Sequence, residues 1–326
     1  MRYQTLYCTR RALEGILDNT DSEIFKVLTD YSKVKVRISE EEFDDLINED
    51  PYFNDLLKMI PSDFFPYENE GELEAFDIRI DDDLDRNALS SSTGFLHLCS
   101  SDDKIPLTTS FPWNFTKGEK YIDPTNNQIK CWEFALKEIK DIHFNSIVIS
   151  DNYLFTGSHP IDNLKGIFKG LLNRNLKSEL HISIFAENGR NQLTRQKIYG
   201  YYGTLLAFIK TLVDVEIRLQ IILHTDSGEL HERLIITNYQ SIQSNQGYTK
   251  FDTSKGLSII DNHSELFHHY HALDLGSDRI RMKYINRELR KRFNVFNKLM
   301  ARKEIKNDNV FIVGSEEINR LFSSLN

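Results

Sequence analysis

Cysteine is scarce in this chain, and its spacing excludes two classes of small fold. Cys8, Cys99 and Cys131 lie far apart and form no Cys-x-x-Cys pair. This spacing argues against a zinc ribbon and against a disulfide framework. It favours reduced thiols that are buried in the fold, as free cysteines usually are.

Long apolar runs are lacking as well. No segment approaches the roughly 20 apolar residues that span a bilayer. The first residues carry their charges after the apolar ones, unlike a secretory signal peptide, and no repeat or low-complexity tract occurs. The 326 residues therefore predict a soluble, cytoplasmic protein without a transmembrane segment, of a length that usually holds two domains.

The net charge of -9 is distributed unevenly along the chain. Before residue 100, Asp and Glu outnumber Lys and Arg by roughly two to one, whereas Arg279 to Lys306 is basic. We therefore expect different partners at the two ends, with a protein partner for the acidic N-terminal part.

The N-terminal part is predicted to be an acidic α+β domain, residues 1–110. Ser39 followed by Glu42 is a capping box that should open a helix. The Pro- and Asn-containing stretch from Ser100 to Asn127 favours a linker, so we place the boundary near residue 110. The other elements expected before it are strands at Tyr3–Thr9 and Val34–Ile38, helices over Arg11–Tyr31 and an exposed strand at Leu73–Ile80.

Strand and helix patterns alternate in the second domain, residues 111–326. Such alternation predicts parallel pairing, hence a mixed, largely parallel sheet covered by helices. The turn at Thr225–Gly228 should add Leu230–Thr237 as an antiparallel hairpin. Strands are expected at Ser146–Phe155, Leu180–Ala186 and Val215–His224, and helices at Gln128–Ile142, Ile161–Leu172 and Gln192–Val213.

His231, Arg233 and Asn238 form the string LHERLIITN, with one residue and then four residues between them. On a strand, His231 and Arg233 would point to one face. A guanidinium offers charge and a planar fork of donors, while an imidazole can attack phosphorus or donate a hydrogen bond. The pair therefore predicts a phosphate site.

This string resembles the His-x-Lys, four residues, Asp motif of the phospholipase D superfamily, with Arg233 and Asn238 in place of lysine and aspartate. It is more similar to the phospholipase D-like C-terminal domain of MIT-domain proteins, whose bacterial relatives occur in conflict and phage-defence loci. HERLIITNYQSIQSNQGYTKF resembles one segment of that family, and VISDNYLF with Asn163 and Leu164 resembles another. The resemblance implies a phospholipase D-like half-domain that uses no metal or other cofactor, with ligand contacts at His231, Arg233, Asp151, Tyr153 and Asn163.

Three functional hypotheses remain open. Catalysis in the superfamily needs two motifs whose histidines face each other, and this chain has one motif. An active enzyme would therefore be a homodimer. It would be a metal-independent phosphodiesterase or nuclease with His231, Arg233 and Asn238 as its catalytic residues. The leading hypothesis is instead a non-catalytic protein that binds a nucleic acid, a nucleotide or an anionic headgroup. The third is an assembly scaffold.

Other clusters carry weaker indications. The basic helix expected over Arg279–Lys306 could present Arg287, Arg290 and Lys291 to nucleic acid or lipid, or pack its apolar stripe internally. Tyr199, Tyr201 and Tyr202 could stack bases or fill a helix–sheet seam. The histidines 263, 268, 269 and 271 with Glu265, and the aspartates 77, 81, 82, 83 and 85, are more typical of polar surface than of metal sites.

Overall fold

The chain divides into two compact units, Tyr3–Phe115 and Thr116–Asn326. The sequence places the boundary near residue 110. The structure, a computed structural model, describes residues 4–9, 12, 13, 15, 29, 32–49, 51, 54, 55, 58, 65–67, 94–98, 118–121, 131–136, 144–156, 159–188, 193–225, 230–245, 247–249, 251, 252, 258, 259, 265–270, 281–301, 310–323 and 325.

The first unit contains a four-stranded sheet in the order β3-β2-β1-β4. All three strand pairings are parallel. The described residues do not test the α+β class of this domain, which stays a prediction. The Leu73–Ile80 strand and the aspartates from 77 to 85 lie outside the described residues. The elements are β1 (Gln4–Thr9), β2 (Ser32–Arg37), α3 (Glu40–Glu49), β3 (Phe65–Tyr67) and β4 (Leu96–Leu98).

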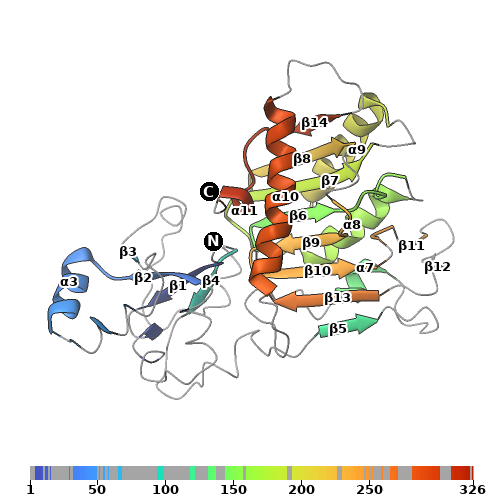
Figure 1. Ribbon diagram of the computed structural model, residues 1–326. Helices are drawn as coiled ribbons and strands as arrows, with labels where there is room; N and C mark the ends of the chain where they lie inside the picture. Colours follow the sequence, from blue (N-terminus) through green and yellow to red (C-terminus); the bar gives the residue numbers. More distant parts are fainter. Residues whose placement is uncertain are drawn as a thin grey trace. The chain divides into compact units, whose positions relative to one another are not determined.

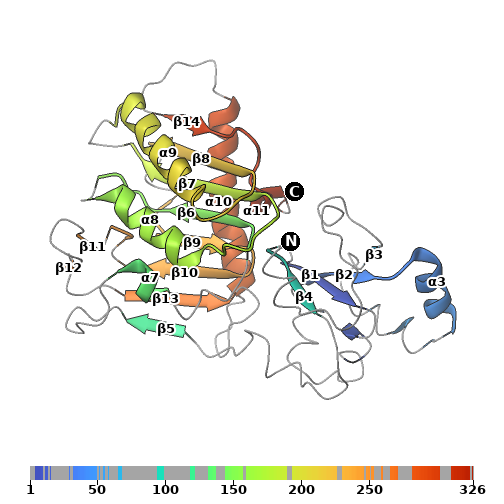
Figure 2. The same cartoon turned by 180° about the vertical axis from the view of Figure 1, so that it is seen from behind.

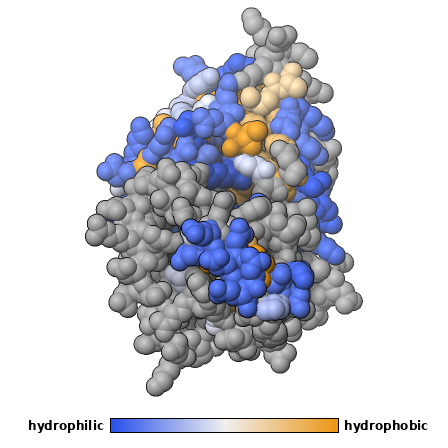
Figure 3. All heavy atoms as spheres, turned by 90° about the vertical axis from the view of Figure 1, so that its left-hand side faces the viewer, coloured by the Kyte–Doolittle hydropathy of each residue, from blue (hydrophilic) through white to orange (hydrophobic). Residues whose placement is uncertain are grey.

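The capping box at the start of α3 is present as predicted. The Ser39 hydroxyl accepts a hydrogen bond from the Glu42 backbone N–H at 3.1 Å, and Glu42 Oε2 accepts one from the Ser39 N–H at 3.1 Å. The helix beyond it exposes its carboxylates, and Figure 3, which faces this side, shows a hydrophilic surface over α3. This helix therefore presents an acidic surface, whereas the predicted protein partner of this part of the chain stays a prediction.

The second unit is built on an eight-stranded mixed sheet in the order β14-β8-β7-β6-β9-β10-β13-β5 (Figure 1). Strands β6, β7 and β8 are parallel, and every other pairing in the sheet is antiparallel. This arrangement confirms the mixed α/β class, but the prediction of a largely parallel sheet is wrong, because two of the seven strand pairings are parallel and five are antiparallel. The strands are β5 (Gly118–Tyr121), β6 (Ser146–Ser150), β7 (Leu180–Glu187), β8 (Ile217–His224), β9 (Leu234–Thr237), β10 (Gln240–Ser244), β13 (Glu265–Tyr270) and β14 (Phe311–Gly314), and a separate pair joins β11 (Phe251–Asp252) to β12 (Ser258–Ile259).

Helices cover both faces of this sheet. Figure 2 shows α7 (Trp132–Ala135), α8 (Pro160–Leu171) and α9 (Arg195–Ile209) on one face, and α10 (Arg281–Ala301) and α11 (Arg320–Ser323) lie on the other. Because side chains alternate along a strand, Ile147 and Ile149 pack in the core beneath α8 and Val148 packs in the core beneath α10. Both faces are buried, which explains the nearly continuous apolar strands.

One predicted pairing is wrong. The sequence suggests that Leu230–Thr237 forms a hairpin with the strand before it, but β9 pairs with β6 and β10 instead. The edge of β8 that does not face β7 pairs with β14, with Phe311 opposite Leu223. Strand β9 therefore lies beside β6, on the edge of β6 that does not face β7. This crossover brings the segment before β9 to the carboxyl end of β6.

No helix within the described ranges combines the length and the apolar character needed to cross a membrane.

Candidate functional site

A buried carboxylate marks the carboxyl end of β6. Asp151 is 1% exposed, and its backbone N–H donates to the Phe185 carbonyl of β7 at 3.1 Å. Its Oδ1 accepts a hydrogen bond from the Tyr153 N–H at 3.0 Å, and its Oδ2 accepts one from the Tyr248 N–H at 2.8 Å. The bond from the Tyr153 N–H to the Asp151 carboxylate forms an Asx turn that leads the chain away from the sheet, so β6 ends at Ser150 rather than at Phe155 as predicted.

Arg233 provides the positive charge beside Asp151. Its Nε lies 3.8 Å from Asp151 Oδ1, its Nη1 donates to the Asn245 carbonyl, and its guanidinium carbon lies 5.4 Å from the centroid of the Tyr153 ring. The cation balances a charge that would be costly to bury alone. Within the described part of the chain Nη2 has no hydrogen-bond partner, and the side chain is 26% exposed, so donors remain for a ligand.

The segment after β10 closes over this carboxylate. Gly247 has a φ of +90°, and a Cβ at this position would lie 2.6 Å from Asp151 Oδ2. The Gly247 carbonyl accepts a hydrogen bond from the Ser244 hydroxyl at 2.7 Å. Glycine is therefore required twice here, for its backbone conformation and for the close approach.

Tyr248 ties this segment to the one before β9. Its ring is fully buried, and its hydroxyl lies 2.7 Å from the Ile242 carbonyl and 3.1 Å from the Arg233 carbonyl. Burial, and secondarily the charge of Asp151, raise the pKa of Tyr248 well above its usual value. The phenol therefore stays protonated and can donate, which fixes the backbone that carries Arg233. The sequence gives one signal for these residues, a glycine in a polar turn after a strand.

His231 lies just before β9 and is exposed. The chain bends at Glu232 and β9 begins only at Leu234, so the strand alternation expected to place His231 and Arg233 on one face does not apply. Arg233, rather than His231, belongs to the cluster around Asp151.

Asn163 is buried in α8, with every hydrogen-bonding position of its side chain used inside the protein. Its Oδ1 accepts from Trp132 Nε1 at 2.8 Å and from the Phe251 N–H at 3.0 Å. Its Nδ2 donates to the carbonyls of Phe251 at 2.9 Å and His159 at 3.1 Å. An amide has two donors and two acceptor lone pairs, so none remains for a ligand. The predicted ligand contact is a cross-link between α7, α8 and β11.

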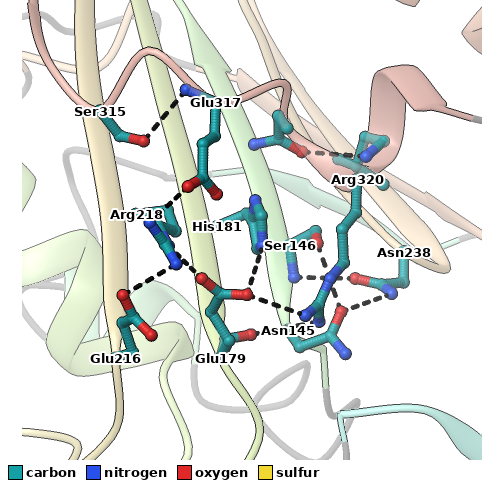
Figure 4. Close-up of polar contacts among 12 residues, drawn as sticks. Asn145, Ser146, Glu179, His181, Glu216, Arg218, Asn238, Ser315, Glu317 and Arg320 are labelled. Atoms are coloured by element: carbon teal, nitrogen blue, oxygen red, sulfur yellow. Dashed lines mark hydrogen bonds and ion pairs between the residues drawn. The ribbon is translucent and has the colours of Figure 1, made fainter. Parts of the chain in front are cut away.

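Asn238 lies at the other end of β9 from Arg233. Its Oδ1 accepts from the Ser146 N–H at 3.0 Å, and its Nδ2 donates to Asn145 Oδ1 at 3.0 Å (Figure 4). A strand advances about 3.3 Å per residue, so the five steps from Arg233 to Asn238 span about 17 Å, and His231 precedes Arg233 by two further residues. Asn238 therefore cannot orient the His231 imidazole as the predicted catalytic set requires.

The amino edge of the parallel strands carries an ion network. Glu179 Oε2 lies 3.2 Å from both His181 Nε2 and Arg320 Nη2, and Oε1 of the same residue pairs with Arg218 (Figure 4). Arg218 also contacts Glu317 at 2.6 Å. Burial, followed by the charge of Arg320, lowers the pKa of His181 to about 4. This network joins β7, β8 and the segment before α11, which is a structural role.

The predicted basic helix corresponds to α10, and its apolar stripe is buried against the sheet. Ile285 and Leu289 are fully buried beneath it. On its outer side, Arg287 Nε and Lys291 Nζ lie 3.3 and 2.8 Å from Glu288 Oε1, and Arg290 donates to the Leu325 carbonyl at 3.3 Å. The internal-packing alternative is therefore correct for the stripe, and each of the three predicted surface cations has an intramolecular contact.

A fully buried ion pair in α10 reaches the segment before β9. Arg292 and Glu288 are both 0% exposed, with Nη1 and Oε2 3.1 Å apart. Arg292 Nη2 also donates to the Glu232 carbonyl at 2.9 Å. Burial lowers the pKa of Arg292, and the Glu288 carboxylate opposes this shift. Arg292 thus holds the backbone between His231 and Arg233 from the opposite face of the sheet.

The remaining candidates do not gather at this site. His268 and His269 lie on strand β13, not on the helix required for His268 and His271 to share a face, and His263 and His271 lie outside the described residues. In the described part of the chain no group of three acidic, histidine or cysteine side chains could hold a metal ion. Tyr201 stacks on Phe155 at 5.5 Å, whereas Tyr199 is exposed on α9.

Comparison with known proteins adds no identification, since no protein-family model and no curated protein matches this chain.

Proposed function

We propose that the unit Thr116–Asn326 is a phospholipase D-like half-domain that binds a phosphate-bearing ligand without cleaving it. The observation that carries this proposal is the state of Arg233, a half-buried guanidinium that Asp151 and the Asn245 carbonyl hold while Nη2 keeps its donors. A preorganised guanidinium with free donors suits the paired oxygens of a phosphate.

The arrangement around His231 supports binding more than catalysis. An imidazole that attacks phosphorus needs a partner to fix its tautomer, and Asn238 is used at the far end of β9. Ligands compatible with the site are nucleotides, nucleic acids and anionic headgroups. A role in bacterial phage defence is proposed from the family resemblance alone.

The test is a calorimetric titration of the full chain with pyrophosphate, adenosine monophosphate, ribose 5-phosphate and inositol trisphosphate. Arg233→Ala should lower the affinity for the ligand that binds by about 10-fold or more, because a charge-assisted hydrogen bond is lost. Arg174→Ala, which removes an exposed arginine between α8 and β7, is the matched control and should change nothing. Equal affinities of both variants and the wild type would end this proposal.

The exposure of His231 favours one second candidate, a homodimeric, metal-independent phosphodiesterase in which this histidine faces its counterpart. It requires cleavage of a phosphodiester in the presence of EDTA, a dimer in solution, and loss of cleavage in His231→Ala. Absence of turnover in a confirmed dimer would remove it.

A further inference from the structure

We infer that Tyr153 and Arg233 together form a nucleotide-binding platform, on which the Tyr153 ring stacks a base and Arg233 holds the phosphate. This inference rests on the proposed phosphate-binding function and names its ligand class, a nucleoside phosphate.

Tyr153 is an exposed aromatic residue on a fixed backbone. Its N–H donates to Asp151 Oδ1, and its carbonyl accepts from both the N–H and the hydroxyl of Thr156, at 3.1 and 2.9 Å. The two residues that follow it, Leu154 and Phe155, are 0% and 3% exposed and pack in the core. The turn is thus anchored on both sides of Tyr153, while Tyr153 itself is 58% exposed.

This exposure is unusual within the described residues. Three large apolar or aromatic side chains are exposed there, namely Tyr153, Tyr199 at 56% and Ile318 at 46%. Tyr153 differs from the others because a guanidinium lies over its ring. Arg233 lies over one face of the ring and more than half of the residue is in solvent, so a base would stack on the opposite face.

One buried carboxylate positions both groups. Asp151 accepts the Tyr153 N–H and lies beside the Arg233 Nε, so the ring and the cation keep their spacing without a ligand. Preorganisation of this kind reduces the entropy lost on binding. The site also lies at the carboxyl end of a parallel strand, where open α/β sheets bind their ligands.

A base and a phosphate in one ligand account for this pair better than either alone. Stacking accepts any base, because every base has a π face, and the phosphate supplies the charge that Arg233 recognises. A chain with a net charge of -9 and local contacts from one arginine is poorly suited to a long polyanion, whose binding depends on many cations. The chemistry therefore fits a single nucleotide, free or at an exposed position of a single strand.

The experiment compares four probes on the full chain by calorimetry: adenosine monophosphate, ribose 5-phosphate, adenosine and a ten-residue oligodeoxyadenylate. Tyr153→Leu removes the ring, Tyr153→Phe keeps it, and Tyr199→Leu removes the equally exposed tyrosine of α9 as a matched control. Melting temperatures show whether each variant folds, and we expect little change because both tyrosines are exposed.

We expect Tyr153→Leu to weaken adenosine monophosphate binding about 5- to 100-fold while Tyr153→Phe and Tyr199→Leu stay within about twofold of wild type. Ribose 5-phosphate, which lacks a base, should bind more weakly than adenosine monophosphate and be unaffected by Tyr153→Leu. Oligodeoxyadenylate that binds more tightly than adenosine monophosphate identifies a strand as the source of the nucleotide, and equal or weaker binding identifies the free nucleotide.

Three outcomes overturn the inference. If Tyr153→Leu and Tyr199→Leu behave alike while Arg233→Ala still abolishes binding, the base platform is wrong and the phosphate site stands. If only pyrophosphate or inositol trisphosphate binds, and binds through Arg233, the platform alone is wrong. If none of the phosphate probes binds, or if Arg233→Ala has no effect on any that does, the platform and the proposed function are wrong together.

Discussion

Replacement of Asn163 by alanine tests whether its side-chain amide stabilises the fold or contacts a ligand. The four hydrogen bonds of its side chain satisfy Trp132 Nε1, both backbone groups of Phe251 and the His159 carbonyl. Trp132 and Phe251 are 1% and 2% exposed, so water cannot easily replace the lost partner. Each buried polar group left unsatisfied costs about 1–3 kcal/mol, and we expect a total loss of about 3–5 kcal/mol.

For a unit of this size that loss lowers the melting temperature by about 6–20 °C, since 1 kcal/mol corresponds to about 2–4 °C. Thermal unfolding followed by Trp fluorescence and far-UV circular dichroism measures it. Asn294→Ala, on the exposed side of α10, is the control and should shift the transition by no more than about 2 °C. A melting temperature of Asn163→Ala equal to that of the control, together with weaker adenosine monophosphate binding, would refute the structural assignment.

Three further predictions concern stability. Burial lowers the pKa of His181 from 6.5 to about 4, so acidification protonates the unfolded chain first. The stability present above pH 6.5 therefore falls by up to about 3 kcal/mol toward pH 4. The free energy of unfolding in urea should depend less on pH across this range in His181→Asn, and an unchanged slope would contradict the assignment. Gly247→Ala should lower the free energy of unfolding by about 2–4 kcal/mol, because Gly247 has a positive φ and lies close to Asp151. Gly200→Ala, in an open part of α9, should raise it by about 0.5–1 kcal/mol. Equal effects of the two substitutions in thermal unfolding would argue against this reasoning. Arg292→Met should lose about 3–5 kcal/mol, because the buried Glu288 Oε2 loses its ion-pair partner and the Glu232 carbonyl loses a donor, while Lys291 and Arg287 stay on Oε1. The double variant with Glu288→Leu should lose clearly less than the sum of the two single losses, and strict additivity in urea unfolding would show that the pair is not coupled.

The alternating strands and helices of the second unit are predictable from the sequence because their periodicities are local. Strands β7 and β8 begin and end within about two residues of the expected positions. The pairing of β9 is not predictable in this way, since the local pattern after a turn favours a hairpin. The decisive fact is that β14, from the end of the chain, takes the edge of β8.

The site is predictable only in part, for a related reason. The resemblance brings Asp151 and Arg233 to one place, and the structure has them 3.8 Å apart. The resemblance does not distinguish an asparagine that contacts a ligand from one that bonds the protein's own backbone and side chains. It therefore predicts ligand or catalytic roles for Asn163 and Asn238, whose side chains are already used in internal hydrogen bonds. Gly247 has no side chain and the Tyr248 hydroxyl is bonded to backbone carbonyls, so their importance appears only once the carboxylate that they enclose is known.

The crossover of β9 also determines when the site can exist during folding. Asp151 and Tyr248 are bonded across 97 positions of the chain, and Arg233 reaches Asp151 only after β9 has docked beside β6. Closing such a long loop costs more chain entropy than forming local contacts, so we expect these contacts to form after the parallel strands and their helices. We therefore expect the candidate site to be completed only after the strands and helices around it have assembled, so the proposed binding would report completed folding of this unit.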